Sequence, residues 1–302
     1  MNPPPVGLSD RTRAAQDKAR VLREALPWIT RWAGRTLVVK YGGNVASETE
    51  QPLLDAFAAD IALLRRVGLR VVVVHGGGPQ ISTLSERLGL EPRFVDGRRV
   101  TDEATLEVVK MVLLGQVNPE LVGRVTAAGA TAMGVSGTDG GLLTVEAAAG
   151  GALGRVGEIV RVDPEVLAAL LDDGVVPVIA TLGRGLDGAD YNVNADTVAG
   201  AVAVALSAHK LIYLTNVPGL YEDFGTGDQQ LLSEVDVSRL RALLAGGELH
   251  TGMVPKIESI VGALDGGVAQ AHLLDGRVEH ALLLEVFTDE GIGTMVTDKE
   301  RA

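Results

Sequence analysis

The sequence predicts an α/β protein, with a three-layer, doubly wound, mostly parallel sheet that carries helices on both faces. Short apolar runs rich in Val, Leu and Ile alternate with longer helix-like segments along most of the chain, as in βαβ units. Of the 302 residues, 46% are hydrophobic and only 3% are aromatic. An aliphatic core of this kind suits a parallel sheet that is covered by helices.

The N-terminal segment precedes the first predicted strand. Residues 1–10 are rich in proline, and we expect them to be disordered. Residues 11–26 are expected to form an amphipathic helix that Pro27 breaks or kinks. The only two tryptophans of the sequence, Trp28 and Trp32, follow. This segment serves either as a local lid or as an arm that packs on another subunit, and the sequence leaves both alternatives open.

The first half of the chain then alternates strands with helices. We expect strands over residues 36–41, 70–75 and 175–180, and helices over residues 51–67, 79–88 and 164–172. The Gly-rich segment 131–162 is expected to form short strands and hairpins.

Between these elements lies a predicted hairpin followed by two helices. Asp96-Gly97 indicates a tight turn between residues 94–95 and 98–100. Thr101 is expected to be the N-cap of a helix that ends near residue 114. A second helix is expected to begin at Pro119.

The alternation repeats in the second half. We expect helices over residues 195–206, 237–244, 255–264 and 280–286, and strands over residues 210–215, 271–274 and 293–296. The weakest seam in this pattern is 183–190. We therefore predict a tail and N-terminal helix over residues 1–35, an N-terminal lobe over 36–188 and a C-terminal lobe over 189–302, with both lobes sharing one sheet.

Composition excludes several classes of function. The formal net charge is −12 and Lys and Arg are dispersed, which argues against nucleic acid and against an obligate acidic protein partner. The absence of cysteine excludes disulfides, thiol catalysis and Cys-ligated zinc. The five histidines show no metal-site spacing.

The N-terminus is no secretory signal, and the most apolar stretch, residues 198–208, is about half as long as a membrane-spanning helix must be. We therefore expect a soluble cytoplasmic protein.

Two lysines beside glycines predict phosphoryl chemistry. Lys40 ends an apolar run and is followed by Tyr41-Gly42-Gly43, and Lys256 stands at the start of a predicted helix after Gly252-Met253. No Walker A sequence occurs in the chain, so an ordinary P-loop enzyme is excluded. The alternative for each lysine is a solvated residue at the end of an element.

A glycine loop gives the strongest single signal. His75-Gly76-Gly77-Gly78-Pro79 follows four valines, and such a loop before a helix exposes backbone N–H groups to an anion. We expect His75 to be a structural hydrogen-bonding residue rather than a base. The alternative for the loop is a tight turn without a ligand.

Three further segments carry candidate binding residues. Arg98 follows the hairpin turn and offers a guanidinium fork for a carboxylate. Asn192, Asn194 and Asp196 open a predicted helix, where the amides can contact substrate and the carboxylate can orient the lysines. Residues 215–221 end a strand in a turn that suits a nucleotide. The alternatives are a surface arginine, a carboxylate that only stabilises the helix dipole, and an ordinary turn.

One glycine pattern is discounted. Gly183-Arg184-Gly185-Leu186-Asp187-Gly188 matches the dinucleotide-binding spacing. No helix is predicted directly after it, and that fingerprint requires one.

Taken together, these segments resemble the amino acid kinase family, and within it the members that phosphorylate the γ-carboxylate of N-acetyl-L-glutamate. The resemblance runs from about Thr36 to the C-terminus and fits in both order and spacing. Its carriers are residues 38–43, 75–80, 94–102, 191–196 and 252–256.

The resemblance implies a role for each candidate residue, with ATP as co-substrate and Mg²⁺ as cofactor. It implies arginine biosynthesis as the pathway, an acyl phosphate as the product and three catalytic residues: Lys40, Asp196 and Lys256. The implied substrate-binding residues are Gly76, Gly77, Arg98 and Asn192. The implied nucleotide-binding residues are Gly42, Gly43, Thr215, Asn216, Val217, Gly219, Tyr221, Gly252 and Met253. The N-terminal lobe would then bind the acyl substrate and the C-terminal lobe ATP. Many relatives have Asp where this chain has Asn216.

The two ends of the chain resemble the arginine-inhibited branch of the family. In that branch N-terminal helices interlace dimers into a hexameric ring, and arginine binds near the junction. The implied effector residues are His272, Glu285 and Gly291. A PII-type regulatory protein is a further candidate partner. The alternative is that Glu285 is a solvated helix residue and that the N-terminal helix packs on its own subunit.

Other functions stay in competition. A related kinase phosphorylates α-aminoadipate on an acidic carrier protein, but the net charge of −12 argues against such a partner. Aspartate kinase and carbamate kinase match the Arg98 and Asn192 segments less well. A catalytically silent amino-acid sensor is disfavoured because Lys40, Asp196 and Lys256 are all retained.

Overall fold

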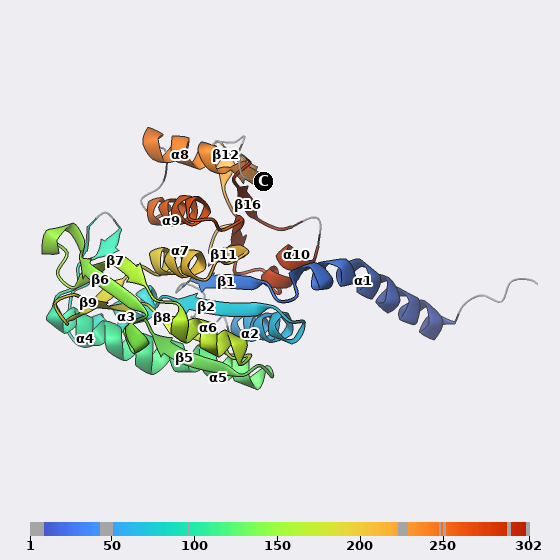
Figure 1. Ribbon diagram of the computed structural model, residues 1–302, viewed down its shortest axis with the longest axis horizontal. Helices are drawn as coiled ribbons and strands as arrows, with labels where there is room; N and C mark the ends of the chain where they lie inside the picture. The colour runs from blue at the N-terminus through green and yellow to red at the C-terminus, as the bar shows by residue number, and fades with distance from the viewer. Residues whose placement is uncertain are drawn as a thin grey trace, which may run out of the picture.

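The computed structural model describes residues 9–42, 51–95, 97–222, 229–247, 249, 252–288 and 291–299 (Figure 1). The predicted disorder of residues 1–10 falls largely outside the described residues. Gly43 of the predicted site also lies outside them.

One eight-stranded sheet forms the centre of the molecule (Figure 1). Its strand order is β14-β16-β15-β11-β1-β2-β8-β5, and every neighbouring pair is parallel except β15 and β16. The strands are β1 (Thr36–Tyr41), β2 (Arg70–His75), β5 (Ala132–Ser136), β8 (Val176–Ala180), β11 (Lys210–Thr215), β14 (Glu234–Asp236), β15 (Gln270–Asp275) and β16 (Thr294–Thr297). The predicted fold class is confirmed.

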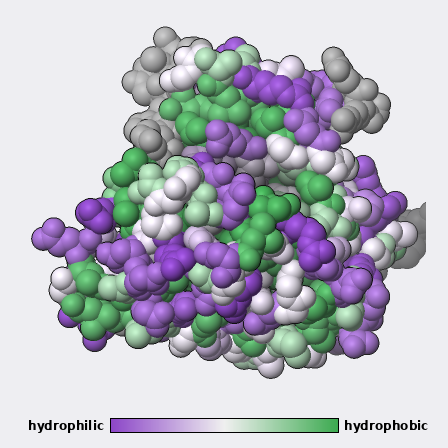
Figure 2. All heavy atoms as spheres, turned by 60° about the vertical axis from the view of Figure 1, so that its left-hand side comes forward, coloured by the Kyte–Doolittle hydropathy of each residue, from purple (hydrophilic) through white to green (hydrophobic). Residues whose placement is uncertain are grey.

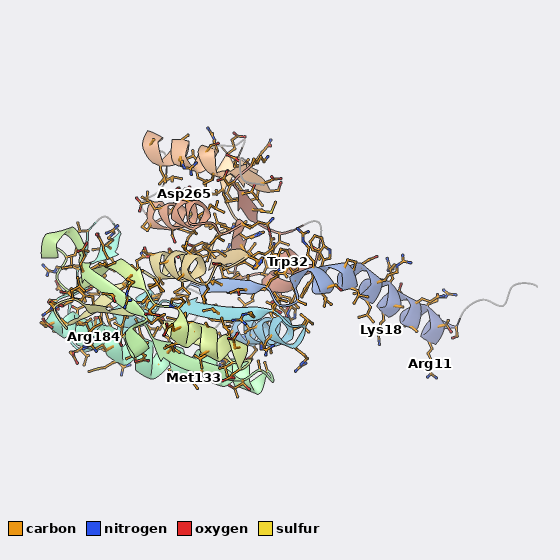
Figure 3. The ribbon with its side chains drawn as sticks, in the orientation of Figure 1. Arg11, Lys18, Trp32, Met133, Arg184 and Asp265 are labelled. Atoms are coloured by element: carbon orange, nitrogen blue, oxygen red, sulfur yellow. The ribbon has the colours of Figure 1, made fainter. Side chains whose placement is uncertain are left out.

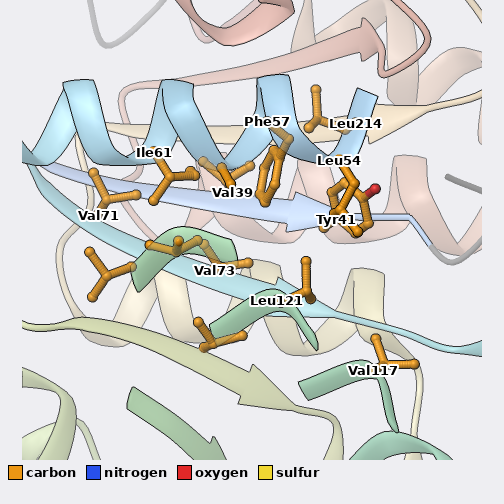
Figure 4. Close-up of a cluster of buried hydrophobic side chains, with 14 of the residues drawn as sticks. Val39, Tyr41, Leu54, Phe57, Ile61, Val71, Val73, Val117, Leu121 and Leu214 are labelled. Carbon is orange, nitrogen blue, oxygen red and sulfur yellow. The ribbon is translucent and has the colours of Figure 1, made fainter. Parts of the chain in front are cut away.

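Helices cover both faces of this sheet. They are α2 (Gln51–Arg66), α3 (Gly78–Arg87), α4 (Glu103–Val112), α5 (Asn118–Ala127) and α10 (Ala281–Phe287) on one face, and α6 (Glu165–Asp172), α7 (Ala195–Ala205), α8 (Val237–Gly246) and α9 (Val254–Asp265) on the other. Successive strand residues point to opposite faces, so Val39 joins the first core and Val38 the second. Figure 4 shows the first core, where Val39 and Tyr41 of β1 meet Phe57 and Ile61 of α2.

Small sheets lie beside the main one. A closed four-stranded barrel contains β6 (Leu143–Ala147), β7 (Val156–Val162), β9 (Leu182–Gly185) and β10 (Asp190–Val193). Two ribbons pair β3 (Phe94–Val95) with β4 (Arg98–Arg99) and β12 (Tyr221–Glu222) with β13 (Gln230–Leu231). Residues 183–190, the predicted seam, form β9 and its hairpin connection to β10. The division into lobes at residue 188 stays a prediction.

The N-terminal helix is longer than expected. Helix α1 (Asp10–Trp32) continues through Pro27, so the predicted break is wrong. Proline removes only one hydrogen bond, to the carbonyl of Arg23, and Arg23 is exposed, so water can satisfy that group. The helix projects from the body (Figure 1). Figure 3 shows Trp32 where α1 joins the body and Lys18 and Arg11 along the projecting part.

The helix after the hairpin begins one residue later than predicted. The N-cap of α4 is Asp102, whose side chain accepts a hydrogen bond from the Thr105 N–H. Thr101 is fully buried, and its hydroxyl instead donates to the Arg99 carbonyl. The chain runs on through one π-helical segment (Leu113–Val117) directly into α5. No helix in the described part of the chain is both long enough and apolar enough to cross a membrane.

Candidate active site

A large cleft opens at the carboxyl ends of the central strands. It has a volume of about 1770 Å³, and Figure 2 shows a furrow between the upper and the broader lower part of the molecule. Strands β1, β2 and β11 are neighbours in the sheet, and ligands of such sheets bind beyond their carboxyl ends. The cleft is lined by the following predicted residues: Lys40, Gly42, Gly76, Gly77, Arg98, Asn192, Asp196, Thr215, Asn216, Val217, Gly219, Tyr221, Gly252, Met253 and Lys256.

Two lysines meet one carboxylate in the middle of this cleft. The Lys40 Nζ lies 2.8 Å from Asp196 Oδ1, and the Lys256 Nζ lies 3.0 Å from both Asp196 oxygens. The three side chains are 8–12% exposed. The structure thus brings together three residues that are up to 216 positions apart in the sequence (256 − 40).

Burial and charge set the protonation of this cluster. Burial alone would raise the pKa of Asp196, but the ammonium groups of Lys40 and Lys256 lower that pKa to about 2. Burial and the neighbouring Lys40 lower the pKa of Lys256 to about 8. At neutral pH the carboxylate is ionised, and the site carries a positive charge that faces the cleft.

Local sequence explains how these side chains are placed. Asn194 is the N-cap of α7, and its side-chain oxygen accepts hydrogen bonds from the N–H groups of Asp196 and Thr197. The sequence left open whether Asn192 or Asn194 faces substrate. The Asn194 oxygen serves the cap, whereas the Asn192 amide donates to the Thr101 hydroxyl at 3.3 Å and leaves the Asn192 side-chain oxygen without a hydrogen bond to the described residues. Both residues line the cleft, and Asn192 stays the predicted substrate contact. Lys256 lies in the first turn of α9, which Pro255 helps to begin.

The glycine loop after β2 leads into the N-terminus of α3. Gly77 is the N-cap of α3, and a Cβ at this position would lie 2.8 Å from Leu113. A larger residue here would therefore have to displace the Leu113 side chain where the loop passes the π-helical segment. His75 is fully buried, with Nδ1 3.0 Å from the Gly76 carbonyl and Nε2 3.0 Å from Asn118 Nδ2. These contacts agree with a structural role.

At one end of the cleft, two consecutive arginines differ in their surroundings. Arg98 is 38% exposed and lies 3.4 Å from Glu158. Arg99 is buried, and its Nη2 donates to the Gly78 carbonyl and to the Ser82 hydroxyl. The Arg99 Nη1 is also buried and has no hydrogen-bond partner among the described residues.

Arg99 also lines the cleft, and it is a candidate that the sequence reasoning missed. The available signal was its position within residues 94–102, one of the segments that carry the family resemblance.

The other end of the cleft is formed by the turn after β11 and by the start of α9. The Thr215 hydroxyl accepts from the Val217 N–H and donates to the Val217 carbonyl, both at 2.9 Å. Gly219 lies against the Thr294 side chain, where a Cβ would lie 2.5 Å from its hydroxyl. Apolar side chains complete this end: Val204, Leu232, Leu243, Leu249 and Met253.

Comparison with known proteins gives the family. The sequence profile of the amino acid kinase family matches residues 35–275. The chain belongs to the amino acid kinase family. An acetylglutamate kinase of Frankia alni is 54% identical over 299 residues, covering 97% of this chain and 86% of the relative. An acetylglutamate kinase of Acidothermus cellulolyticus is 52% identical and covers 94% of this chain and 97% of the relative.

Solved structures agree with this assignment. The N-acetylglutamate synthase of Neisseria gonorrhoeae, complexed with coenzyme A and N-acetyl-glutamate, superimposes with a TM-score of 0.81 at 29% identity. The match covers 93% of this amino acid kinase but 63% of the synthase. Giardia lamblia carbamate kinase bound to AMP-PNP has a TM-score of 0.67 at 17% identity and covers 88% of this chain and 99% of that chain. At 17% identity, the similarity to carbamate kinase shows a shared fold and nothing about substrate.

The cleft of this amino acid kinase has the parts that phosphoryl transfer requires. Two ammonium groups lie beside each other on one ionised carboxylate, and a glycine loop at a helix N-terminus lies next to them. Phosphoryl transfer depends on positioning and on cations near the developing charge.

The predicted effector residues form a separate cluster outside this cleft. The His272 Nδ1 lies 2.6 Å from Glu285 Oε1, and Glu285 Oε2 accepts from the Ile292 N–H. Gly291 passes close by, since a Cβ there would lie 3.2 Å from Glu285 Oε2. Lys210 lies 3.1 Å from His272 Nε2. The three predicted effector residues are thus neighbours.

Proposed function

We propose that this amino acid kinase transfers the γ-phosphoryl group of ATP to the γ-carboxylate of N-acetyl-L-glutamate, a step of arginine biosynthesis. The observation that carries the proposal is the Lys40–Asp196–Lys256 cluster in the middle of one cleft. The names of the relatives, at 52–54% identity, supply the substrate. An enzyme that uses ATP in this pathway is expected in the cytoplasm.

The proposed reaction needs no general base. A carboxylate is ionised near neutral pH and attacks the γ-phosphorus directly, while the bond from that phosphorus to the bridging oxygen of ADP breaks. Lys40 and Lys256 stabilise the charge on the transferring group, and Asp196 fixes both ammonium groups. The N–H groups of Gly76 and Gly77 contribute further donors at the helix terminus.

The acyl substrate occupies the arginine end of the cleft. We expect Arg98 and Asn192 to contact it, as the sequence predicts, and we add Arg99 because its buried Nη1 has no partner among the described residues. A carboxylate of the substrate satisfies such a group by a charge-assisted hydrogen bond. In this arrangement residues 36–188 supply most of the acyl site.

ATP occupies the other end, which residues 189–302 mainly form. Thr215, Asn216, Val217, Gly219, Tyr221, Gly252 and Met253 are the proposed contacts. Mg²⁺ is expected to enter on the ATP phosphates, where it neutralises their charge. Within the described ranges, no three His, Asp or Glu side chains gather as a metal site.

Acceptor specificity tests the proposal. Purified protein is incubated with MgATP and N-acetylglutamate, aspartate, carbamate or α-aminoadipate, and hydroxylamine traps any acyl phosphate as a hydroxamate. Turnover with N-acetylglutamate alone is the expected result. Turnover with another acceptor, or with none, contradicts the proposal.

We further propose that arginine inhibits the enzyme and that α1 assembles it into a hexamer. His272, Glu285 and Gly291 lie together, and Glu285 is an acidic partner for a guanidinium. Helix α1 exposes Val21, Leu22 and Leu26, an apolar stripe that a second copy can cover. A PII-type protein is a candidate regulator of such a ring.

A further inference from the structure

A buried tyrosine lies directly beneath the lysine cluster. Tyr213 of β11 is fully buried, and it is paired with Lys40 across the parallel strands β1 and β11. Its hydroxyl lies 2.7 Å from the Ser259 Oγ and 3.4 Å from the Asp196 carbonyl oxygen. Burial raises the pKa of Tyr213 far above its ordinary value, so the phenol keeps its proton.

Ser259 connects this tyrosine to the helix that carries Asp196. It lies one turn after Lys256 on α9, so both side chains share a helix face. Its hydroxyl lies 2.6 Å from the Asp196 carbonyl oxygen and donates to it. The hydroxyl of Tyr213 therefore donates to Ser259, and the two hydroxyls form one directed chain that ends on the first turn of α7.

A glycine permits this close approach of the two helices. Gly200 lies on α7 opposite Ser259, and a Cβ there would lie 2.4 Å from the Ser259 Oγ and 3.0 Å from its carbonyl oxygen. Any larger residue would push α9 away and lengthen the bond from Ser259 to Asp196.

The tyrosine ring also faces a reacting cation. The Lys256 Nζ lies 5.2 Å from the centre of the Tyr213 ring. The charged groups that face Lys256 are Asp196 on α7 and Lys40 on β1. The negative face of an aromatic ring stabilises a nearby ammonium group, so Tyr213 opposes the repulsion by Lys40.

We infer that Tyr213 and Ser259 are a positioning pair for phosphoryl transfer. The tyrosine ring keeps Lys256 charged and directed at the cleft, and the hydroxyl chain fixes the turn that carries Asp196. The kinetic consequence rests on the proposed function, whereas the effect on the charge of Lys256 does not.

The charge state can be measured without substrate. The chain has six lysines, so a ¹³Cε NMR titration resolves them, and a Lys256→Gln variant assigns the signal of Lys256. In Tyr213→Leu we expect its titration midpoint to fall by about one pH unit. In Tyr213→Phe, which keeps the ring, we expect little change. An unchanged or raised midpoint in Tyr213→Leu overturns the role of the ring.

The matched control is Tyr41→Leu. Tyr41 is a buried tyrosine of the neighbouring strand, but its ring packs on Phe57 at 4.5 Å in the other core. We expect this variant to lose stability and to keep the Lys256 midpoint. If Tyr41→Leu shifts the midpoint as much as Tyr213→Leu, the effect is general loosening and the inference fails.

Kinetics test the hydroxyl chain. We expect Tyr213→Phe and Ser259→Ala each to lower kcat about tenfold with little change in KM, and the double variant to be no slower than either single variant. Additive losses, or losses in KM alone, contradict a shared chain. If wild-type protein does not phosphorylate N-acetylglutamate but the NMR midpoints shift as expected, the proposed function fails and the positioning of Lys256 stands.

Discussion

Lys256 is the site residue whose charge depends most on its surroundings. Its ammonium group is buried beside Lys40, and these two causes lower its pKa to about 8. In the proposed reaction a protonated Lys256 stabilises the transferring group, so we expect activity to fall when this proton is lost. Asp196 must instead lose its proton to hold the two lysines, and its pKa of about 2 keeps it ionised at every pH near neutrality.

We therefore expect kcat/KM to fall above about pH 8, where free Lys256 deprotonates. The limb of kcat should lie at higher pH, because bound ATP adds negative charge beside the ammonium group. Lys256→Arg should remove the alkaline limb while lowering kcat about 100-fold, since a guanidinium stays charged but fits differently. Rate profiles between pH 6 and 10 test this.

Lys110→Gln is the control for that profile. Lys110 pairs with Asp190, and this contact raises the pKa of Lys110. Lys110 does not line the cleft, so its replacement should leave the limb in place. A limb that persists at the same pH in Lys256→Arg would assign it to another group.

The two arginines at the acyl end make a second residue-scale prediction. Arg99→Gln should raise KM for N-acetylglutamate about 100-fold with a smaller change for ATP, because a charged hydrogen bond contributes about 1.5–3 kcal/mol. Arg98→Gln should raise the KM for N-acetylglutamate less, since water screens an exposed charge. Initial rates and thermal unfolding of both variants are compared. A larger effect in Arg98→Gln would restore Arg98 as the main carboxylate ligand.

At the scale of elements, the start of α4 depends on one carboxylate. The Asp102 side chain accepts the Thr105 N–H at 2.8 Å. Asp102→Ala should lower the free energy of unfolding by about 1 kcal/mol, whereas Asp102→Asn should retain most of it. Urea unfolding measures both. Equal losses in the two variants would mean that the cap bond does not stabilise this helix.

Most elements were predictable because their signals are local. Strands β1, β2 and β11 follow from uninterrupted apolar runs, and the helices from their periodicity and capping residues. Pro27 misled the prediction because an exposed helix can hydrate the carbonyl that proline leaves unpaired. The N-cap of α4 was predicted one residue too early, at Thr101 instead of Asp102, since Thr and Asp both occur as N-caps and stand side by side here. Strands β9 and β10 were missed because both are short and the segment is rich in glycine, and because besides each other they pair with β6 and β7, which are distant in sequence.

At the scale of the whole molecule, α1 is the element that the body leaves exposed. Trp32 is buried where the helix meets the body, whereas Leu22 is 67% exposed. Leu22→Glu should reduce the mass measured by light scattering from a hexamer to a dimer and abolish inhibition by arginine. Catalysis with N-acetylglutamate should remain.

Lys18→Glu is the matched control on the same helix. Lys18 is exposed and lies on the projecting part of α1 (Figure 3), so this variant should keep both the mass and the response to arginine. A wild-type mass of a monomer or dimer would contradict the proposed ring. Loss of catalysis together with the ring would show that α1 serves the active site as well.

The sequence by itself determined the fold class and the kinds of element, and it predicted the side chains that the proposed reaction uses. These features depend on local patterns and on residue types such as Lys40, Asp196 and Lys256 that few other functions require together. Only the tertiary structure showed that Arg99 lines the cleft beside Arg98, and that Arg99 is buried whereas Arg98 is partly exposed. It also placed Tyr213 and Ser259 beneath the cluster, because the packing of α7 on α9 joins segments about 60 residues apart, a distance at which the chain carries no local signal.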